Sequence, residues 1–210
     1  MAHKYFGQNE KMKKTTKANP GTKFINFNLP ALKTCPQRGA CEEFCYANQG
    51  RYVFSNVKET LDWRYEATKK EDFVEKICSA LKHEAHNKDL QLYVRLHDSG
   101  DFYDEKYLDK WVQIMRKNPS IQFYAYTKCI SMFKQYNYEH TFPDNFTYIF
   151  SHGGKEDHLI NPFEKQAKIF GPNDKMEDPW VDATDNDMIA IVETHIGLPY
   201  HGTKKWSQDK

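Results

Sequence analysis

The order of its apolar segments is the feature that most limits how this chain can fold. Four short segments have the composition and the alternation of β-strands, and apolar residues recur at helical spacing between them. The four segments are residues 23–29, 90–97, 121–127 and 146–150. Strands that alternate with helices are typical of parallel βαβ units. We therefore predict an α/β fold with a mainly parallel sheet.

The remaining apolar patterns set the size of that sheet. Residues 56–87 predict two helices, and Leu108–Met115 has a helical stripe that ends before Pro119. The apolar run Met188–Val192 predicts a fifth strand, whereas the proline-containing residues 153–180 are expected to form a loop. Five strands do not close an eight-stranded barrel. We expect a partial or abbreviated (β/α) barrel.

Charge and length suggest how the chain is divided. Residues 1–23 hold six lysines against one acid, Glu10. We interpret residues 1–22 as a basic flexible N-terminal arm, residues 23–203 as a single α/β domain, and residues 204–210 as a tail. A chain of 210 residues is long enough to bury a sizeable core in one such domain.

A loop rich in cysteine follows the first predicted strand. Cys35, Cys41 and Cys45 have the spacing C-x5-C-x3-C, and Pro36 and Gly39 interrupt any regular structure between the first two. Cysteine thiolates at short spacing on such a loop bind soft metal ions or iron–sulfur clusters. Three thiolates leave one coordination position open, which is typical of a site for chemistry.

Polar residues also follow the other predicted strands. Because the carboxyl ends of parallel strands meet at one edge of a sheet, we expect these groups to converge with the three cysteines. They are His97, Asp98, Ser99, Gly100 and Asp101 after the second strand, Thr127, Lys128 and Cys129 after the third, and Ser151, His152 and Gly153 after the fourth. Arg95, on the second strand, is a candidate to bind a carboxylate or a phosphate.

Overall composition excludes some classes of protein. The net charge of +1 gives little support for nucleic-acid binding, and no apolar run is long enough to span a membrane. We expect a cytoplasmic protein without a membrane partner. In a reducing compartment five cysteines are not expected to form disulfides, so their clustering indicates metal, cluster or redox chemistry.

Three segments resemble a known family. They are LPALKTCPQRGACEEFCYANQGRY from Leu29, LYVRLHDSGDF from Leu92 and FYAYTKC from Phe123, and together with GLPYHGT from Gly197 they are similar to the phage-associated gene product 88 domain. The resemblance covers roughly residues 24–155. It implies a phage or prophage origin and action in the bacterial cytoplasm.

The same pattern also resembles the first βα units of radical S-adenosylmethionine enzymes. That resemblance implies that Cys35, Cys41 and Cys45 bind three irons of a [4Fe-4S] cluster, with the aromatic Phe44 before the last of them. The spacing is longer than the C-x3-C-x2-C usual in that superfamily.

The resemblance also implies roles for residues outside the loop. The turn Ser99-Gly100-Asp101 would contact S-adenosylmethionine, His97 and Asp101 would position ligand or substrate, and Arg95 and Thr127 would complete the ligand site. The partners implied are a small-molecule ligand and an electron donor.

Other interpretations stay open at this point. Zinc bound by the three cysteines and His97, or His152 in its place, would make the protein a zinc-stabilised, non-enzymatic binding or host-interaction protein. A divalent cation held by His97, Asp98, Asp101 and His152 would instead indicate a metal-dependent nuclease, with the basic arm on the nucleic acid.

Overall fold

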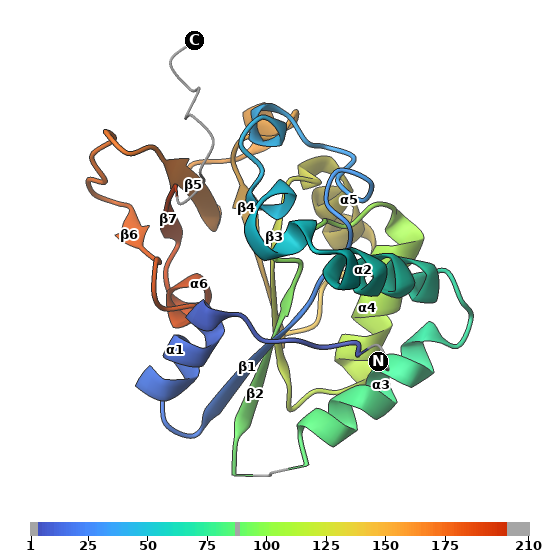
Figure 1. The fold of residues 1–210 in the computed structure, drawn as a ribbon. Helices are drawn as coiled ribbons and strands as arrows, with labels where there is room; N and C mark the ends of the chain where they lie inside the picture. Colours follow the sequence, from blue (N-terminus) through green and yellow to red (C-terminus); the bar gives the residue numbers. More distant parts are fainter. Residues whose placement is uncertain (1–3, 87–88, 201–210) are drawn as a thin grey trace.

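One parallel sheet organises the molecule (Figure 1). The computed structural model describes residues 4–86 and 89–200. Its strands are β1 Thr22–Phe27, β2 Gln91–Leu96, β3 Gln122–Thr127, β4 Phe146–Ser151, β5 Gln166–Phe170, β6 Val181–Asp182 and β7 His195–Pro199. They are ordered β1-β2-β3-β4-β5-β7-β6, and every neighbouring pair is parallel. The curled sheet forms a half-barrel, which confirms the predicted α/β partial barrel.

Helices cover the two faces of the sheet unequally. The helices are α1 Glu10–Ala18, α2 Ser55–Thr68, α3 Phe73–Glu84, α4 Glu105–Lys117, α5 Ile130–His140 and α6 Met188–Val192. Figure 1 shows α2 to α5 together on the outer face, whereas α1 and α6 lie side by side next to the other face. The predicted pair of helices in 56–87 and the predicted helix at Leu108–Met115 are confirmed as α2, α3 and α4.

The larger core lies between the sheet and the outer helices. Helix α4 begins after Asp104, whose side chain accepts a hydrogen bond from the Tyr107 N–H at 2.7 Å. Its apolar stripe turns Trp111 inward, where the indole is fully buried against the rings of Phe27 and Phe73. Burial of such aromatic surface is the main force that fixes these helices on the sheet.

A second, smaller core fills the inner face of the half-barrel. Alternate residues of the strands point inward there, and Phe24, Tyr124 and Ile196 pack with Met12 of α1. Helix α1 is joined to α6 because the backbone N–H of Asp187 donates to Thr15 Oγ1 at 2.8 Å. This packing leaves the carboxyl end of the half-barrel open to form a cavity.

The C-terminal third differs from the sequence prediction. Met188–Val192, expected as the fifth strand, is helix α6. Short apolar runs do not distinguish helix from strand, and here Asn186 Oδ1 accepts the Met188 N–H at 2.9 Å and supports a helical start. Strand β5 lies within residues 153–180, which were expected to form a loop, and β6 follows directly after them. Strand β7 is formed by residues after Val192, for which no strand was predicted.

The N-terminal segment also differs from the expected arm. Residues Glu10–Ala18 form α1, capped by Asn9, and Met12 is fully buried. The first residues of the arm and the tail at 204–210 lie outside the described residues. Within the described part of the chain, no helix is long and apolar enough to cross a membrane.

Candidate functional site

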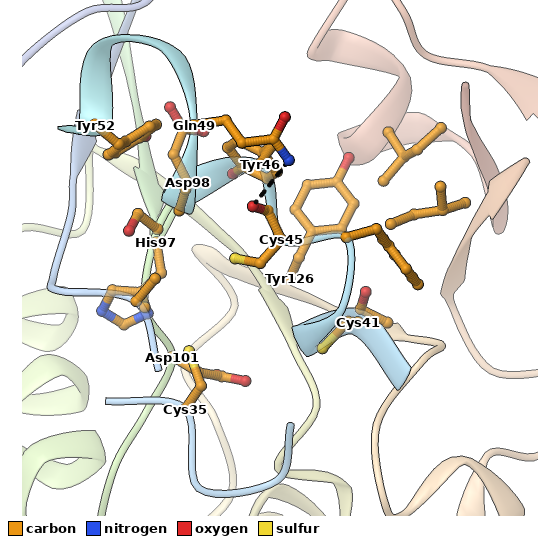
Figure 2. Close-up of a pocket in the computed structure, with 18 of the residues that line it drawn as sticks. Cys35, Cys41, Cys45, Tyr46, Gln49, Tyr52, His97, Asp98, Asp101 and Tyr126 are labelled. Atoms are coloured by element: carbon orange, nitrogen blue, oxygen red, sulfur yellow. Dashed lines mark hydrogen bonds between the residues drawn. The ribbon is translucent and has the colours of Figure 1, made fainter. Parts of the chain in front are cut away.

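The three clustered cysteines line one cavity at the carboxyl end of the half-barrel. The cavity has a volume of about 620 Å³, and its wall includes Cys35, Cys41 and Cys45. Figure 2 shows their side chains around one common space, close to the labelled Asp101 and Tyr126. The cavity is therefore formed by the loop after β1 together with residues from the ends of β2, β3 and β4 and from β7.

Backbone contacts hold the cysteine loop against the end of β4. The N–H of Cys41 donates to the carbonyl oxygen of Gly153 at 3.1 Å, and the N–H of Lys155 donates to that of Gln37 at 3.0 Å. A Cβ atom on Gly39 would lie only 2.8 Å from the carbonyl carbon of Gly154, so glycine permits this close approach. The loop is therefore fixed at the carboxyl ends of two strands, β1 and β4.

Arg38 stabilises the loop from inside. Its Nη1 donates to the carbonyl oxygens of Leu32 at 3.1 Å and Cys35 at 3.2 Å, and its Nε pairs with Glu42 Oε2 at 2.9 Å. One guanidinium thus holds three segments of the loop in a fixed geometry, which its planar fork of donors allows.

The turn after β2 joins the loop to β3. The carboxylate of Asp101 accepts from Thr127 Oγ1 at 2.7 Å and from the backbone N–H groups of Lys128 and Phe102, each at 2.8 Å. Its own N–H donates to the carbonyl oxygen of Thr34 at 3.1 Å. Asp101 is buried, and burial raises the pKa of its carboxyl group.

The environment of Cys35 and Cys45 disfavours free thiolates. Burial, with a smaller contribution from the charge of Asp101, raises the pKa of Cys35 to about 12. Burial also raises the pKa of Cys45, while the nearby cation of Lys128 acts to lower it. A bound cation would supply the positive charge that these thiolates need, so metal binding and deprotonation would be coupled.

His97 lines the cavity, but its ring packs against aromatic residues of the outer core. Its backbone has φ = 69°, and the ring packs on Phe102 at 4.6 Å between centroids. Its Nε2 is 2.8 Å from the Tyr107 hydroxyl, and Nδ1 has no partner among the described residues. Burial lowers the pKa of His97 to about 3, so the imidazole is neutral.

The other predicted site residues divide between the cavity wall and the structure behind it. Ser99 and Gly100 line the cavity, although Ser99 Oγ donates to the carbonyl oxygen of Leu29 at 2.8 Å. Phe44 also lines it and packs edge-on against Tyr200. Thr127 is buried behind the wall, where its hydroxyl is used by Asp101.

Arg95 faces the inner side of the sheet and lines the cavity. Its Nη1 is 3.0 Å from Asp98 Oδ1 and 3.5 Å from Asp187 Oδ1, and its guanidinium lies over the ring of Tyr126 at 4.7 Å. Lys11 of α1 completes the group, with Nζ 2.9 Å from Asp187 Oδ1. The group of Lys11, Arg95, Asp98 and Asp187 is called the ion-pair cluster below.

Sequence reasoning missed several residues of this site. Lys11 lies in the segment expected to be a flexible arm, and Asp187 directly precedes the segment expected to be the fifth strand. No sequence pattern indicated that the two residues are neighbours. Lys128, expected at this edge of the sheet but given no role in the site, lines the cavity and donates to Ser151 Oγ at 2.7 Å. Tyr46 and Tyr52, from the short helices η2 Tyr46–Asn48 and η3 Gly50–Val53, form an aromatic wall with ring centroids 5.9 Å apart.

The histidines and acids proposed for other metals are engaged elsewhere. In the described part of the chain, the one group of three or more potential ligands within 4.8 Å of one another is Glu105, Glu139 and His140, which is exposed and far along the chain from the cysteines. His152 Nε2 is 2.8 Å from Gln166 Oε1. Among the described residues, neither the three cysteines nor the set His97, Asp98, Asp101 and His152 contains three ligand atoms within 4.8 Å of one another.

Cys129 and Cys78 do not line the cavity formed by the described residues. Cys129 Sγ donates to the carbonyl oxygen of Phe102 at 3.1 Å, and Cys78 accepts from Asn118 Nδ2 at 3.3 Å. Both thiols pack in or against the outer core.

Comparisons with known proteins identify one family. The chain is 30% identical over 103 residues to the Gene 88 protein of Mycobacterium phage L5, and 26% identical over 102 residues to the Gene 88 protein of Mycobacterium phage D29. Each match covers 45% of this chain, and the chain spans only 43% and 42% of the lengths of these two relatives. No solved structure matches the chain.

A family model covers far more of the chain than these pairwise matches. The model described as Gene product 88 matches residues 3–208, which include the cysteine loop, all seven strands and every residue of the cavity wall named above. The phage origin implied by the sequence is supported by the two mycobacteriophage relatives. The chain belongs to the Gene product 88 family.

Proposed function

We propose that this protein is an iron–sulfur protein in which Cys35, Cys41 and Cys45 bind a [4Fe-4S] cluster and one iron stays open to S-adenosylmethionine. The observation that carries the proposal is the convergence of these three thiols on one cavity at the carboxyl end of a parallel half-barrel. Sulfur ligands are the donors that such clusters prefer.

The separation of the sulfur atoms favours a cluster over a single zinc ion. Ligands of one tetrahedral zinc, each about 2.3 Å from the ion, lie within roughly 4 Å of one another. The sulfur atoms of Cys35, Cys41 and Cys45 do not all lie within 4.8 Å of one another. Cysteines that bind three different irons of a cluster stand farther apart than the ligands of one ion, which fits this arrangement.

The rest of the wall suits a ligand beside such a cluster. Residues of the Ser99-Gly100-Asp101 turn line the cavity next to the thiols, but the side chains of Ser99 and Asp101 are used within the protein. This turn would therefore offer its backbone to the ligand, while Phe44 and Lys128 border the same space. When bound together, an open-site cluster and S-adenosylmethionine supply reductive cleavage of the sulfonium and a radical for hydrogen abstraction.

The protein's own residues would position the ligand and exclude water. Arg38 and Asp101 fix the loop and the turn, and the aromatic wall of Tyr46 and Tyr52 encloses the cavity. His97, neutral and turned into the outer core, would act by positioning the turn after β2. The substrate is a small molecule, the electron donor is external, and the site of action is the bacterial host cytoplasm, where thiols stay reduced.

The test is chemical analysis of protein purified without oxygen. About four irons and four sulfides per chain are expected, with an electron paramagnetic resonance spectrum of the reduced protein that changes when S-adenosylmethionine is added. Cys35→Ser, Cys41→Ser and Cys45→Ser should each remove the cluster. Cys78→Ser is the matched control, because Cys78 packs on the outer core away from the cavity.

Three outcomes would contradict all or part of the proposal. One zinc per chain without sulfide would make the protein a zinc-stabilised binding or host-interaction protein. Loss of iron from Cys78→Ser equal to that from Cys45→Ser would remove the assignment of the ligands. A full cluster whose spectrum ignores S-adenosylmethionine would keep the iron–sulfur site and exclude the radical enzyme.

A further inference from the structure

The ion-pair cluster forms a part of the cavity that the proposed cysteine site does not use. Lys11, Arg95 and Asp98 line the cavity, while Asp187 is fully buried behind them. The cluster comes from three distant segments: α1, the end of β2 and the residue before α6. Bringing two cations and two carboxylates under cover carries a large desolvation cost. Such a group needs a reason beyond stability.

The carboxylate of Asp98 is already satisfied on the cavity side, whereas Asp187, fully buried behind the wall, has Oδ2 without a partner among the described residues. Asp98 accepts from Arg95 through Oδ1 and, through Oδ2, from the side-chain amides of Asn9 at 2.5 Å and Asn26 at 2.7 Å. Asp187 Oδ1 receives both Lys11 and Arg95. Asp98 thus has little capacity left to accept a hydrogen bond from a ligand in the cavity.

The donors, by contrast, are only partly used. Arg95 makes both ion pairs through Nη1, and its Nε is buried without a partner among the described residues. The Lys11 ammonium has three N–H donors and one carboxylate partner, Asp187. The Tyr126 hydroxyl also lacks a partner in the described part of the chain, although the residue is only 8% exposed and lines the cavity. A buried donor without an acceptor is costly, so this wall is incomplete without one.

We infer that the ion-pair cluster and Tyr126 form an oxyanion subsite, which takes the carboxylate or phosphate group of the small-molecule substrate. An oxyanion supplies the acceptors that Arg95, Lys11 and Tyr126 lack, and guanidinium is well suited to both groups. The fixed negative charges of Asp98 and Asp187 hold the two cations in place in the absence of the anion. The inference rests on the proposed function only in calling the bound compound a substrate.

The test uses inorganic phosphate and acetate as separate probes. The complete protein, purified without oxygen, is titrated by calorimetry at constant ionic strength maintained with chloride. Saturable binding of at least one probe is expected. Lys11→Gln should weaken that binding by about tenfold or more. The matched control is Lys14→Gln on the same helix, because Lys14 pairs with Asp185 at the surface and should not matter.

A second variant distinguishes a loss of binding from a loss of folding. Arg95→Gln alone leaves Asp98 without a cation and Asp187 with Lys11 only, whereas the double change Arg95→Gln and Asp98→Asn removes both partners of one ion pair together. The double variant should fold and bind the probe more weakly, again by about tenfold or more. Binding of phosphate but not acetate indicates a phosphate ester, and the reverse indicates a carboxylic acid.

The inference is overturned if neither probe binds saturably, or if Lys11→Gln and Lys14→Gln have the same effect. The oxyanion subsite and the cysteine site are tested independently. Cys45→Ser should lose iron but keep the Lys11-dependent binding of the probe. A protein without iron that still binds the probe would refute the proposed function alone, and a protein with a full cluster that binds neither probe would refute the oxyanion subsite alone.

Discussion

The backbone N–H of Asp101 donates a hydrogen bond of 3.1 Å to the carbonyl oxygen of Thr34, the residue immediately before Cys35. The carboxylate of the same Asp101 accepts the N–H of Lys128 at the end of β3. One residue therefore couples the first cysteine to the ends of two neighbouring strands. The geometry of the thiols depends on this turn as much as on their own loop.

Replacing Asp101 should destabilise the protein and reduce its iron content together. Asp101→Ala leaves the Thr127 hydroxyl and the Lys128 N–H without their acceptor in a buried place, which costs about 2–4 kcal/mol. Asp101→Asn keeps one acceptor oxygen and should cost less. Urea unfolding and iron analysis of both variants provide the measurement. A stable Asp101→Ala protein with full iron would show that the turn is not structural.

Gly100→Ala should displace the cysteine loop. Gly100 has φ = +88°, and an added Cβ would lie 2.6 Å from Thr34 Oγ1 and 2.7 Å from Leu29 Cβ. The strained backbone of a non-glycine residue at this φ, together with the overlap of the added Cβ with Thr34 and Leu29, should lower the free energy of unfolding by about 3 kcal/mol. Gly21→Ala is the matched control, because Gly21 has φ = +82° with nothing within 4 Å, and it should cost only about 1 kcal/mol. Equal losses from the two variants, measured by denaturant unfolding, would argue against the close approach.

Arg38 is expected to influence metal affinity more than stability. Arg38→Gln removes the donors to the carbonyl oxygens of Leu32 and Cys35 in a partly exposed loop. Because the thiols are then less well positioned, iron should be lost to a chelator about ten times faster, while the free energy of unfolding should change by less than about 1 kcal/mol. Arg51→Gln, at the exposed rim of the same cavity, is the comparison. Identical rates of iron loss would refute this role.

The stability of the protein should fall in acid partly because of His97. Its pKa is lowered from 6.5 to about 3 in the folded protein, so the unfolded chain binds the proton more readily. The contribution of the neutral ring is complete above pH 6.5 and is lost as the pH falls toward 3. The slope from this group approaches about 1.4 kcal/mol per pH unit below roughly pH 6.

Urea unfolding between pH 7 and pH 4.5 can isolate that contribution. His97→Gln should show a shallower decline than the unaltered protein, whereas His158→Gln, at an exposed position, should leave the decline unchanged. If His97→Gln follows the same curve as the unaltered protein, then His97 is already charged in the folded state or is accessible to water.

The first half of the fold could be predicted because its signals are local. The alternation in β2 and the stripe of α4 are each contained in about ten residues, and parallel topology follows from their order. The convergence of Cys35, Cys41 and Cys45 with the turn after β2 also followed from that order. These expectations needed no knowledge of packing between distant segments.

The remainder depends on contacts that no local pattern encodes. Helix α6 lies next to α1, to which the Asp187 N–H is bonded through Thr15 Oγ1, and Lys11 pairs with Asp187 although the two are far apart in the chain. His97 would face the cavity by simple alternation, but its positive φ turns the ring toward Phe102. No glycine marks that position, so the sequence carries no sign of the reversal.

The place of β7 in the sheet has a consequence for the timing of assembly. This last strand lies between β5 and β6, and the described part of the chain gives β6 no other strand to pair with. Leu198 and Pro199 of β7 also form part of the wall around the thiols. Synthesis proceeds from the N-terminus, so the cysteine loop is made long before this wall exists. The three sulfur atoms are therefore open to solvent throughout most of the chain's production, and the chamber around them closes last.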